Sequence, residues 1–145
     1  MRLIVLNGPN LNMLGARDKE KYGSLSLEDI NSRLVKEYPD VEFHFFQSNL
    51  EGELVTKIQS ASSYYDGLII NPAGYSHTSV SIRDALEICT IPKVEVHLSN
   101  IADREDFRAR SITASKTNGY VTGFKINGYL AAVYLIQKIL ADRKL

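Results

Sequence analysis

The sequence predicts a single α/β domain in which helices cover both faces of a five-stranded parallel sheet. Apolar runs alternate with amphipathic segments five times along the 145 residues, a length typical of one domain with one sizeable core. Two of these runs, 3–6 and 68–70, are apolar at every position, as expected of central strands in a parallel sheet. No internal repeat or low-complexity linker interrupts the alternation, so we expect residues 1–145 to form one catalytic or binding unit.

Five segments have the composition of strands, and they cover residues 2–7, 41–47, 68–71, 94–99 and about 119–124. For five β-α units of this length, the flavodoxin-like strand order 2-1-3-4-5 is the commonest arrangement. In such doubly wound sheets, ligands bind outside the carboxyl ends of the strands, near the point where the strand order reverses. We therefore expect function to reside in the loops at 7–25, 71–78 and 98–111.

Four segments have the period of amphipathic helices. Ser26 precedes the first, Ser48 and Glu51 form a predicted capping box before the second, and the others cover about 78–88 and 128–142. The positions expected to face the core are Leu27, Ile30, Leu34 and Val35, then Leu54, Ile58 and Ala61, then Val80, Ala85, Leu86 and Ile88, and finally Leu130, Val133, Ile136 and Leu140.

The formal net charge is zero, because 17 lysine and arginine residues balance 17 aspartate and glutamate residues. This balance gives no overall attraction to nucleic acid or to an anionic membrane surface. The single cysteine, Cys89, cannot form a disulfide within the chain, and no apolar stretch approaches the ~18 residues of a membrane span. We therefore expect a soluble cytoplasmic protein that binds neither nucleic acid nor membranes.

The strand at 94–99 has one polar face, which carries Glu95, His97 and Ser99. If this strand lies inside the sheet, its polar side chains enter a covered layer, where unpaired polar groups cost about 1–3 kcal/mol each and charges cost more. They must then pair with one another or with a ligand. The alternative is an edge strand with one face in water. His97, oriented by Glu95, has the chemistry of a proton donor or acceptor near neutral pH.

The loop after the first strand is longer than a simple connection requires. Its segment 15–25 carries Arg17 and Tyr22 between Gly15 and Gly23, which favours a mobile lid over the site. A solvated charged loop with an ordinary surface tyrosine is the alternative. Because a tyrosine has an ordinary pKa of about 10, a lid tyrosine acting as a base needs neighbouring cations. Arg17 and Arg108 are the candidates.

The loops after the third and fourth strands carry groups suited to an oxygen-rich anion. Asn71 and His77 precede a helix, whose first N–H groups favour such ligands, although Ser76 or Thr78 would serve equally as a plain N-cap. Backbone N–H groups at Leu98 and Ser99 suit a carboxylate. One or more of the arginines at 104, 108 and 110 would neutralise it, unless these side chains serve only surface solubility.

Several common chemistries lack their motifs in this sequence. Neither a dinucleotide-binding Gly-x-Gly-x-x-Gly, nor a P-loop, nor a serine-hydrolase Gly-x-Ser-x-Gly occurs. The three histidines, at 44, 77 and 97, do not have the spacing of a metal site. Acid–base chemistry is the reaction type that the remaining residues favour.

Five blocks of residues, in order along the chain, closely resemble the type II 3-dehydroquinate dehydratase family. The blocks are Asn7 to Asn12, Arg17 to Gly23, Asn71-Pro72 with His77 to Ser79, Arg83 to Leu86, and Glu95 to Ile101 with Arg108. The resemblance implies dehydration of 3-dehydroquinate to 3-dehydroshikimate through an enolate, in the shikimate pathway or in quinate breakdown. It also implies that the reaction uses no metal or cofactor, and that the chain forms a homo-oligomer, typically a dodecamer built from four trimers.

The same resemblance implies a role for each matching residue. Tyr22, as a phenolate, would remove a proton beside the ketone, and His97 would protonate the departing hydroxyl. Asn12 would stabilise the enolate through a held water. Arg17 and Arg108 would favour the phenolate, and Glu95 would orient His97. The substrate would be held by Asn71, His77, Arg108 and the Leu98-Ser99 backbone. Asp84 would reach a neighbouring subunit's site.

The chain departs from the family pattern at two positions, Lys19, where a lid proline is usual, and Lys125, where a small residue is expected. Lys19 lacks the fixed φ of proline, which favours a mobile lid. Two other classes of protein share the predicted fold. A flavin- or phosphate-binding module would need a hydroxyl- and glycine-rich loop after the first strand, and a response regulator would need an aspartate where Asn71 stands.

Overall fold

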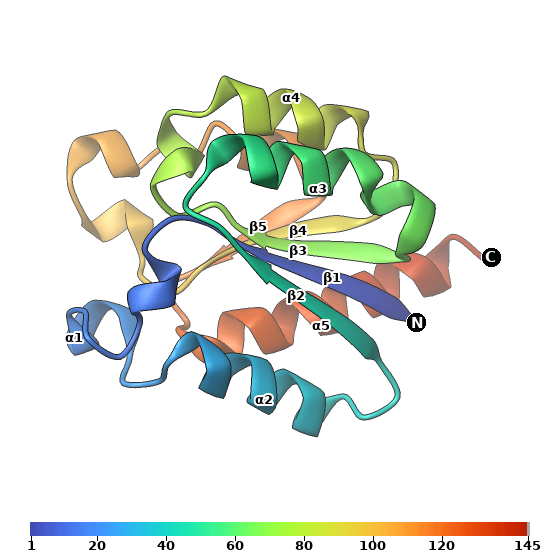
Figure 1. The fold of residues 1–145 in the computed structure, drawn as a ribbon, viewed down its shortest axis with the longest axis horizontal. Coiled ribbons are helices and arrows are strands. Elements are labelled where there is room, and N and C mark those ends of the chain that lie inside the picture. Colours follow the sequence, from blue (N-terminus) through green and yellow to red (C-terminus); the bar gives the residue numbers. More distant parts are fainter. Residues whose placement is uncertain (145) are drawn as a thin grey trace.

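Five parallel strands form one sheet with the order β2-β1-β3-β4-β5 in the computed structural model, which describes residues 1–144 (Figure 1). The strands are β1 (Arg2–Asn7), β2 (Glu42–Gln47), β3 (Gly67–Asn71), β4 (Lys93–His97) and β5 (Gly119–Thr122). This confirms the predicted doubly wound architecture. Because β4 pairs with β3 on one side and with β5 on the other, the alternative of an edge strand at 94–99 is wrong.

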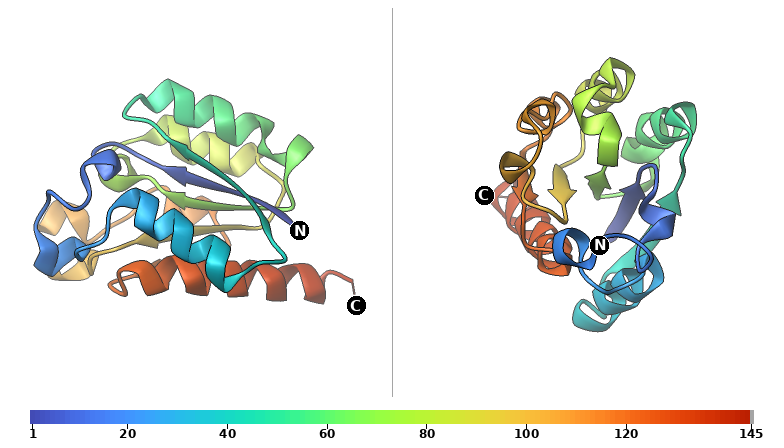
Figure 2. Two further views of the ribbon diagram at one scale, coloured as in Figure 1. Left: turned by 60° about the horizontal axis from the view of Figure 1, so that its bottom comes forward. Right: turned by 90° about the vertical axis from the view of Figure 1, so that its left-hand side faces the viewer.

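Helices cover both faces of the sheet, as Figures 1 and 2 show. The helices α2 (Leu27–Glu37) and α5 (Ile126–Asp142) lie on one face, and α3 (Glu51–Tyr64) and α4 (Val80–Ile88) lie on the other. A one-turn helix, α1 (Lys19–Tyr22), lies within the predicted lid, beyond the carboxyl ends of the strands. The other loops contain the 3₁₀ turns η1 (Leu11–Met13), η2 (Ala73–His77), η3 (Ile101–Asp103), η4 (Asp106–Arg108) and η5 (Ala114–Lys116).

Each face of the sheet packs its own apolar core, because alternate strand residues point to opposite faces. Leu3, Val5 and Ile69 pack against α2 and α5, whereas Leu68 and Ile70 pack against α3 and α4. Within residues 1–144, no helix has both the length and the apolar character that a membrane crossing requires.

Three side chains predicted to be buried are exposed in the structure. Val80 is 58% exposed, Ile88 67% and Val35 49%. Helix α4 begins after Ser79, whose hydroxyl accepts a hydrogen bond from the Ile82 backbone N–H at 2.9 Å. Ile82, Ala85 and Leu86 therefore face the sheet at helical spacing, and Val80 and Ile88 face outward with Asp84 between them.

One of the two predicted helix caps is correct. Ser26 and Asp29 form a capping box at the start of α2. The box predicted for Ser48 and Glu51 is wrong, because α3 begins after Leu50 and Glu51 is its first residue. The Ser48 hydroxyl instead accepts from the Leu50 backbone N–H at 2.9 Å and donates to Glu53.

The chain segments that leave β1 and β3 touch each other at the reversal of strand order. The Gly8 N–H donates to the Asn71 carbonyl at 2.8 Å. A Cβ atom on Gly8 would lie 2.5 Å from the Pro72 carbonyl oxygen, a distance that no side chain tolerates, so only glycine permits this approach. Directly beyond this contact, Ala73 has a φ of +53°, held by the Asn71 side chain, which accepts from the Ala73 N–H at 3.1 Å.

Candidate active site

The loops after β1, β3 and β4 enclose a cavity of about 90 Å³ at the carboxyl ends of the strands. The lining residues are Pro9, Asn10, Leu11, Arg17 and Tyr22 from the first loop, Asn71, Ala73, Gly74 and His77 from the second, and His97, Leu98, Ser99, Ile101, Arg104 and Arg108 from the third. These are the three segments in which the strand order predicted the site. The cavity is small beside the ~300–1,000 Å³ of common ligand pockets.

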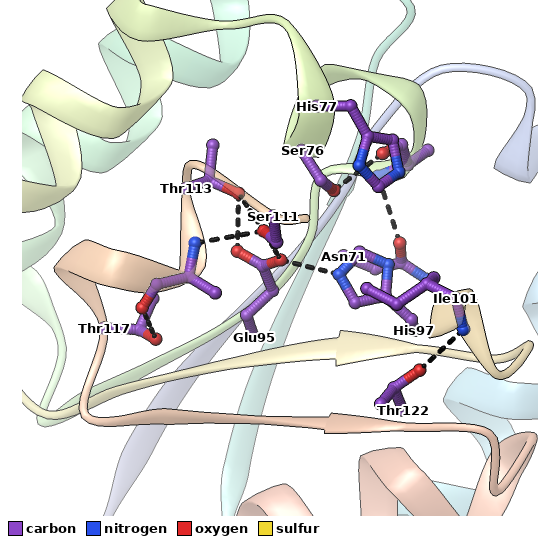
Figure 3. Close-up of polar contacts among 12 residues, drawn as sticks. Asn71, Ser76, His77, Glu95, His97, Ile101, Ser111, Thr113, Thr117 and Thr122 are labelled. Atoms are coloured by element: carbon purple, nitrogen blue, oxygen red, sulfur yellow. Dashed lines mark hydrogen bonds and ion pairs between the residues drawn. The ribbon is translucent and has the colours of Figure 1, made fainter. Parts of the chain in front are cut away.

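Glu95 is a fully buried carboxylate at the centre of a hydrogen-bond network (Figure 3). Its Oε1 atom accepts from His97 Nε2 and from the Ser111 hydroxyl, both at 2.6 Å. Its Oε2 atom accepts from the Thr113 hydroxyl, also at 2.6 Å. Three donors thus compensate for the loss of water around the charge, and hydrogen bonds to an ionised acceptor are among the strongest in proteins.

The two histidines of the site are each held by a hydrogen bond on one ring nitrogen. Because Glu95 accepts from His97 Nε2, that nitrogen carries a proton and Nδ1 is left for chemistry in the cavity. His77 Nδ1 donates to the Arg110 carbonyl at 2.9 Å, which leaves Nε2 as an acceptor in the neutral ring. The two rings stack with centroids 6.4 Å apart. Both can therefore face one bound molecule.

Tyr22 lies close to two guanidinium groups. Arg17 Nη2 donates to the Tyr22 hydroxyl at 3.0 Å, and the Arg17 Cζ atom lies 4.0 Å from the centre of the tyrosine ring. The Arg104 Cζ atom lies 5.4 Å from the same centre, and Arg104 Nη1 donates to the Ser99 hydroxyl at 3.2 Å. Tyr22 is therefore the phenol of the cavity that lies nearest to positive charge.

The sequence assigned the second cation beside Tyr22 to Arg108, but in the structure Arg104 lies there. Arg108 also lines the cavity. However, it ends the 3₁₀ turn η4, and its Nε donates to Glu105 at 3.0 Å. The clustered arginines at 104, 108 and 110 were the available signal for Arg104, but a sequence pattern does not say which member turns inward.

The structure brings together most, but not all, of the predicted site residues. Asn12 and Asp84 do not line the cavity. Asn12 is exposed on η1, where its Oδ1 accepts from Gln47 Nε2 at 3.5 Å, and Asp84 is exposed on α4, where it pairs with Arg83 at 2.8 Å. The roles given to both residues stay predictions, as does the mobility of the lid at 15–25. Through residue 144, no three His, Cys, Asp or Glu side chains converge in the manner of a metal site.

Two supports of the site had no signal in the sequence. Ser111 and Thr113 belong to an irregular segment, 16 and 18 residues beyond Glu95, and they reach it because the chain after β4 folds back toward α4. Alternation of polar residues on one strand indicated that Glu95 needed partners. It could not show which distant hydroxyls would supply them.

The protein is thus a doubly wound α/β protein. The loops at the carboxyl ends of its strands bring a tyrosine paired with an arginine and a histidine paired with a carboxylate to one cavity. This arrangement is that of an acid–base site. A family model described as dehydroquinase class II matches residues 1–137. The chain belongs to this family, which confirms the resemblance found in the sequence.

Individual relatives match over nearly the whole chain. The 3-dehydroquinate dehydratase of Fusobacterium nucleatum is 51% identical over 144 residues, covering 94% of this chain and 97% of that protein. The 3-dehydroquinate dehydratase of Thermotoga petrophila is 48% identical over 145 residues, covering 98% and 99%. The crystal structure of type II dehydroquinase from Butyrivibrio crossotus superposes with a TM-score of 0.91 at 40% identity, covering 94% of this chain and 97% of that one.

Replacement of Thr113 by valine is expected to lower the free energy of unfolding by about 1.5–3 kcal/mol, the usual contribution of a hydrogen bond to a charged group. Thr113 is fully buried, and valine keeps its shape while removing the donor to Glu95. Urea denaturation measures the change. Thr56→Val is the matched control, because the exposed Thr56 hydroxyl bonds only to the Gly52 carbonyl, and a change under about 0.5 kcal/mol is expected. Equal losses in both variants would contradict the prediction.

Proposed function

We propose that this protein removes water from 3-dehydroquinate to give 3-dehydroshikimate, the reaction for which its relatives are named. The proposal rests on one observation, namely that two side chains, each held by a charged partner, line the same cavity. The Tyr22 hydroxyl is bonded to Arg17, and the His97 ring is bonded to the buried Glu95. An elimination needs a base on one side of the new double bond and an acid on the other.

In the proposed reaction, Tyr22 as a phenolate removes the proton from the carbon beside the ketone. The electron pair of the broken C–H bond forms an enolate, whose charge Asn12 stabilises through a held water. Collapse of the enolate forms the carbon–carbon double bond and breaks the bond to the neighbouring hydroxyl. His97 donates a proton to that hydroxyl, which leaves as water, in an overall anti elimination.

The substrate's carboxylate and hydroxyls are proposed to bind at the edge of the cavity formed by Asn71, His77, Leu98 and Ser99, with Arg108 beside them. All five residues line the cavity. The carboxylate would accept from backbone N–H groups after β4, and the arginines would balance its charge. No metal or cofactor takes part in the proposed reaction.

The proposal is tested by mixing purified protein with 3-dehydroquinate, without added metal or cofactor, and following the ultraviolet absorbance of the conjugated enone product. Wild-type protein is expected to form product, and Tyr22→Phe and His97→Ala are expected to lose about 10²–10⁴-fold in kcat. The controls are Tyr38→Phe and His44→Ala, which lie outside the cavity and should keep activity. No product from folded wild-type protein would overturn the proposal and favour a binding module; flavin absorbance in the purified protein would then identify its ligand.

Arg104→Gln tests whether the second guanidinium beside Tyr22 favours the phenolate. The activity of an enzyme that uses a phenolate base rises with pH as the phenol loses its proton. Removal of a nearby positive charge makes the phenolate less favourable, so the rising limb should move to higher pH, by about one pH unit. Arg110→Gln is the control, because that side chain is exposed and outside the cavity. An unchanged limb in the Arg104 variant, or an equal shift in both variants, would show that Arg104 does not act on Tyr22.

We further propose that the chain acts in the cytoplasm as a homo-oligomer, a dodecamer built from trimers, in which Asp84 reaches a neighbouring site. The outward face of α4 supports an interface at this helix. Val80, Asp84 and Ile88 stand four residues apart on that face, so one carboxylate lies between two exposed apolar side chains.

The assembly is checked by light scattering of the purified protein, with an expected mass of about twelve chains of 16.3 kDa. Ile88→Glu places a charge in the proposed interface and should give smaller species with lower activity. Val35→Glu, at an exposed apolar position on α2, should leave the mass unchanged. A monomeric wild-type protein would refute the proposed assembly but would not contradict the proposed reaction.

A further inference from the structure

A second polar cluster lies on the opposite face of the sheet from Glu95. The register pairs Asn7, at the end of β1, with Asn71, at the end of β3. Alternation places both side chains on the α5 face, because their neighbours two positions back, Val5 and Ile69, pack in that core. Both asparagines are buried, with 1% and 3% of their surface exposed. Their amides therefore need partners from the helix that covers them.

Tyr129 on α5 supplies those partners. Its side chain is fully buried, and its hydroxyl donates to Asn7 Oδ1 at 2.6 Å and accepts from Asn71 Nδ2 at 3.0 Å. Burial raises the pKa of Tyr129 well above its ordinary value, so the hydroxyl stays protonated at any physiological pH. The three side chains form one directed line of hydrogen bonds, from Asn71 through Tyr129 to Asn7.

The hydrogen bonds that the Asn71 side chain makes within the protein leave one of its N–H donors for the cavity. The Ala73 backbone N–H can only donate, and its bond to Asn71 Oδ1 at 3.1 Å fixes which end of the amide carries oxygen. One of the two Nδ2 hydrogens goes to Tyr129. Asn71 also lines the cavity. Its second Nδ2 hydrogen is therefore available to an acceptor on the substrate.

We propose that Tyr129 is a positioning residue, which acts through Asn71 to hold this N–H donor toward an oxygen atom of the bound substrate. The inference rests on the proposed function, because it assigns a binding contact in that same site. It extends the site to a residue that has no access to the cavity and lies in the helix behind the sheet. With the amide clamped at both ends, the donor is oriented before the substrate arrives, which lowers the entropic cost of binding.

The test measures the Kd of 3-dehydroquinate by titration calorimetry in the Tyr22→Phe background, where no turnover interferes. Tyr129→Phe removes only the hydroxyl and should raise Kd by about 3–10-fold, the usual range for one hydrogen bond. Tyr38→Phe is the matched control, because the Tyr38 hydroxyl also bonds to α5, at the Leu130 carbonyl, 2.8 Å away, but outside the site. It should leave Kd unchanged. If Tyr129→Phe does not fold, Asn7→Ala tests the same line from its other end and should weaken binding in the same direction.

A double-mutant cycle separates positioning from general damage. If Tyr129 acts through Asn71, then Tyr129→Phe should not raise Kd further once Asn71 is alanine. Additive effects, equal effects of the Tyr129 and Tyr38 variants, or an unchanged Kd in a folded Tyr129→Phe protein would each overturn the inference. Binding without product in the wild-type protein would refute the proposed function while the positioning result stands, and no binding at all would refute both.

Discussion

The buried charge of Glu95 is the constraint on which the functional end of this molecule depends. A carboxylate with no exposed surface, in the middle of a parallel sheet, is tolerated only if donors replace its water. One donor, His97, comes from the same strand, and two come from Ser111 and Thr113. The chain between β4 and β5 must therefore fold back over the sheet, and this path also carries Arg104 and Arg108 to the cavity.

The sheet separates two polar systems that serve one cavity. Glu95 and His97 lie on the face covered by α3 and α4, and the line from Asn71 to Asn7 lies on the face covered by α5. Each system includes one residue that lines the cavity, His97 in the first and Asn71 in the second. Groups held by buried partners keep their geometry without the substrate, which is the requirement for preorganised chemistry.

Sequence reasoning was reliable where a short-range pattern determines structure. Period-two alternation put Glu95 and His97 on one face, and uninterrupted apolar runs identified the central strands. It did not single out Arg104, and it could not find Ser111, Thr113 or Tyr129, because irregular segments and helix–sheet contacts depend on the whole fold. The prediction that Val80 and Ile88 face the core was wrong for another reason. Apolar residues on a helix recur with the same periodicity whether they face a core or a partner protein.

Positive charge gathers around Tyr22 although the chain has zero net charge. Arg17 donates a hydrogen bond to the Tyr22 hydroxyl, and its guanidinium also lies against the tyrosine ring. The guanidinium of Arg104 lies 5.4 Å from the centre of the same ring. The only carboxylate facing this region from β4, Glu95, is already bonded to three donors. Glu105, in the same loop as Arg104 and Arg108, pairs with both of them, at 3.7 and 3.0 Å. The charged groups near Tyr22 therefore come from two loops rather than from the sheet.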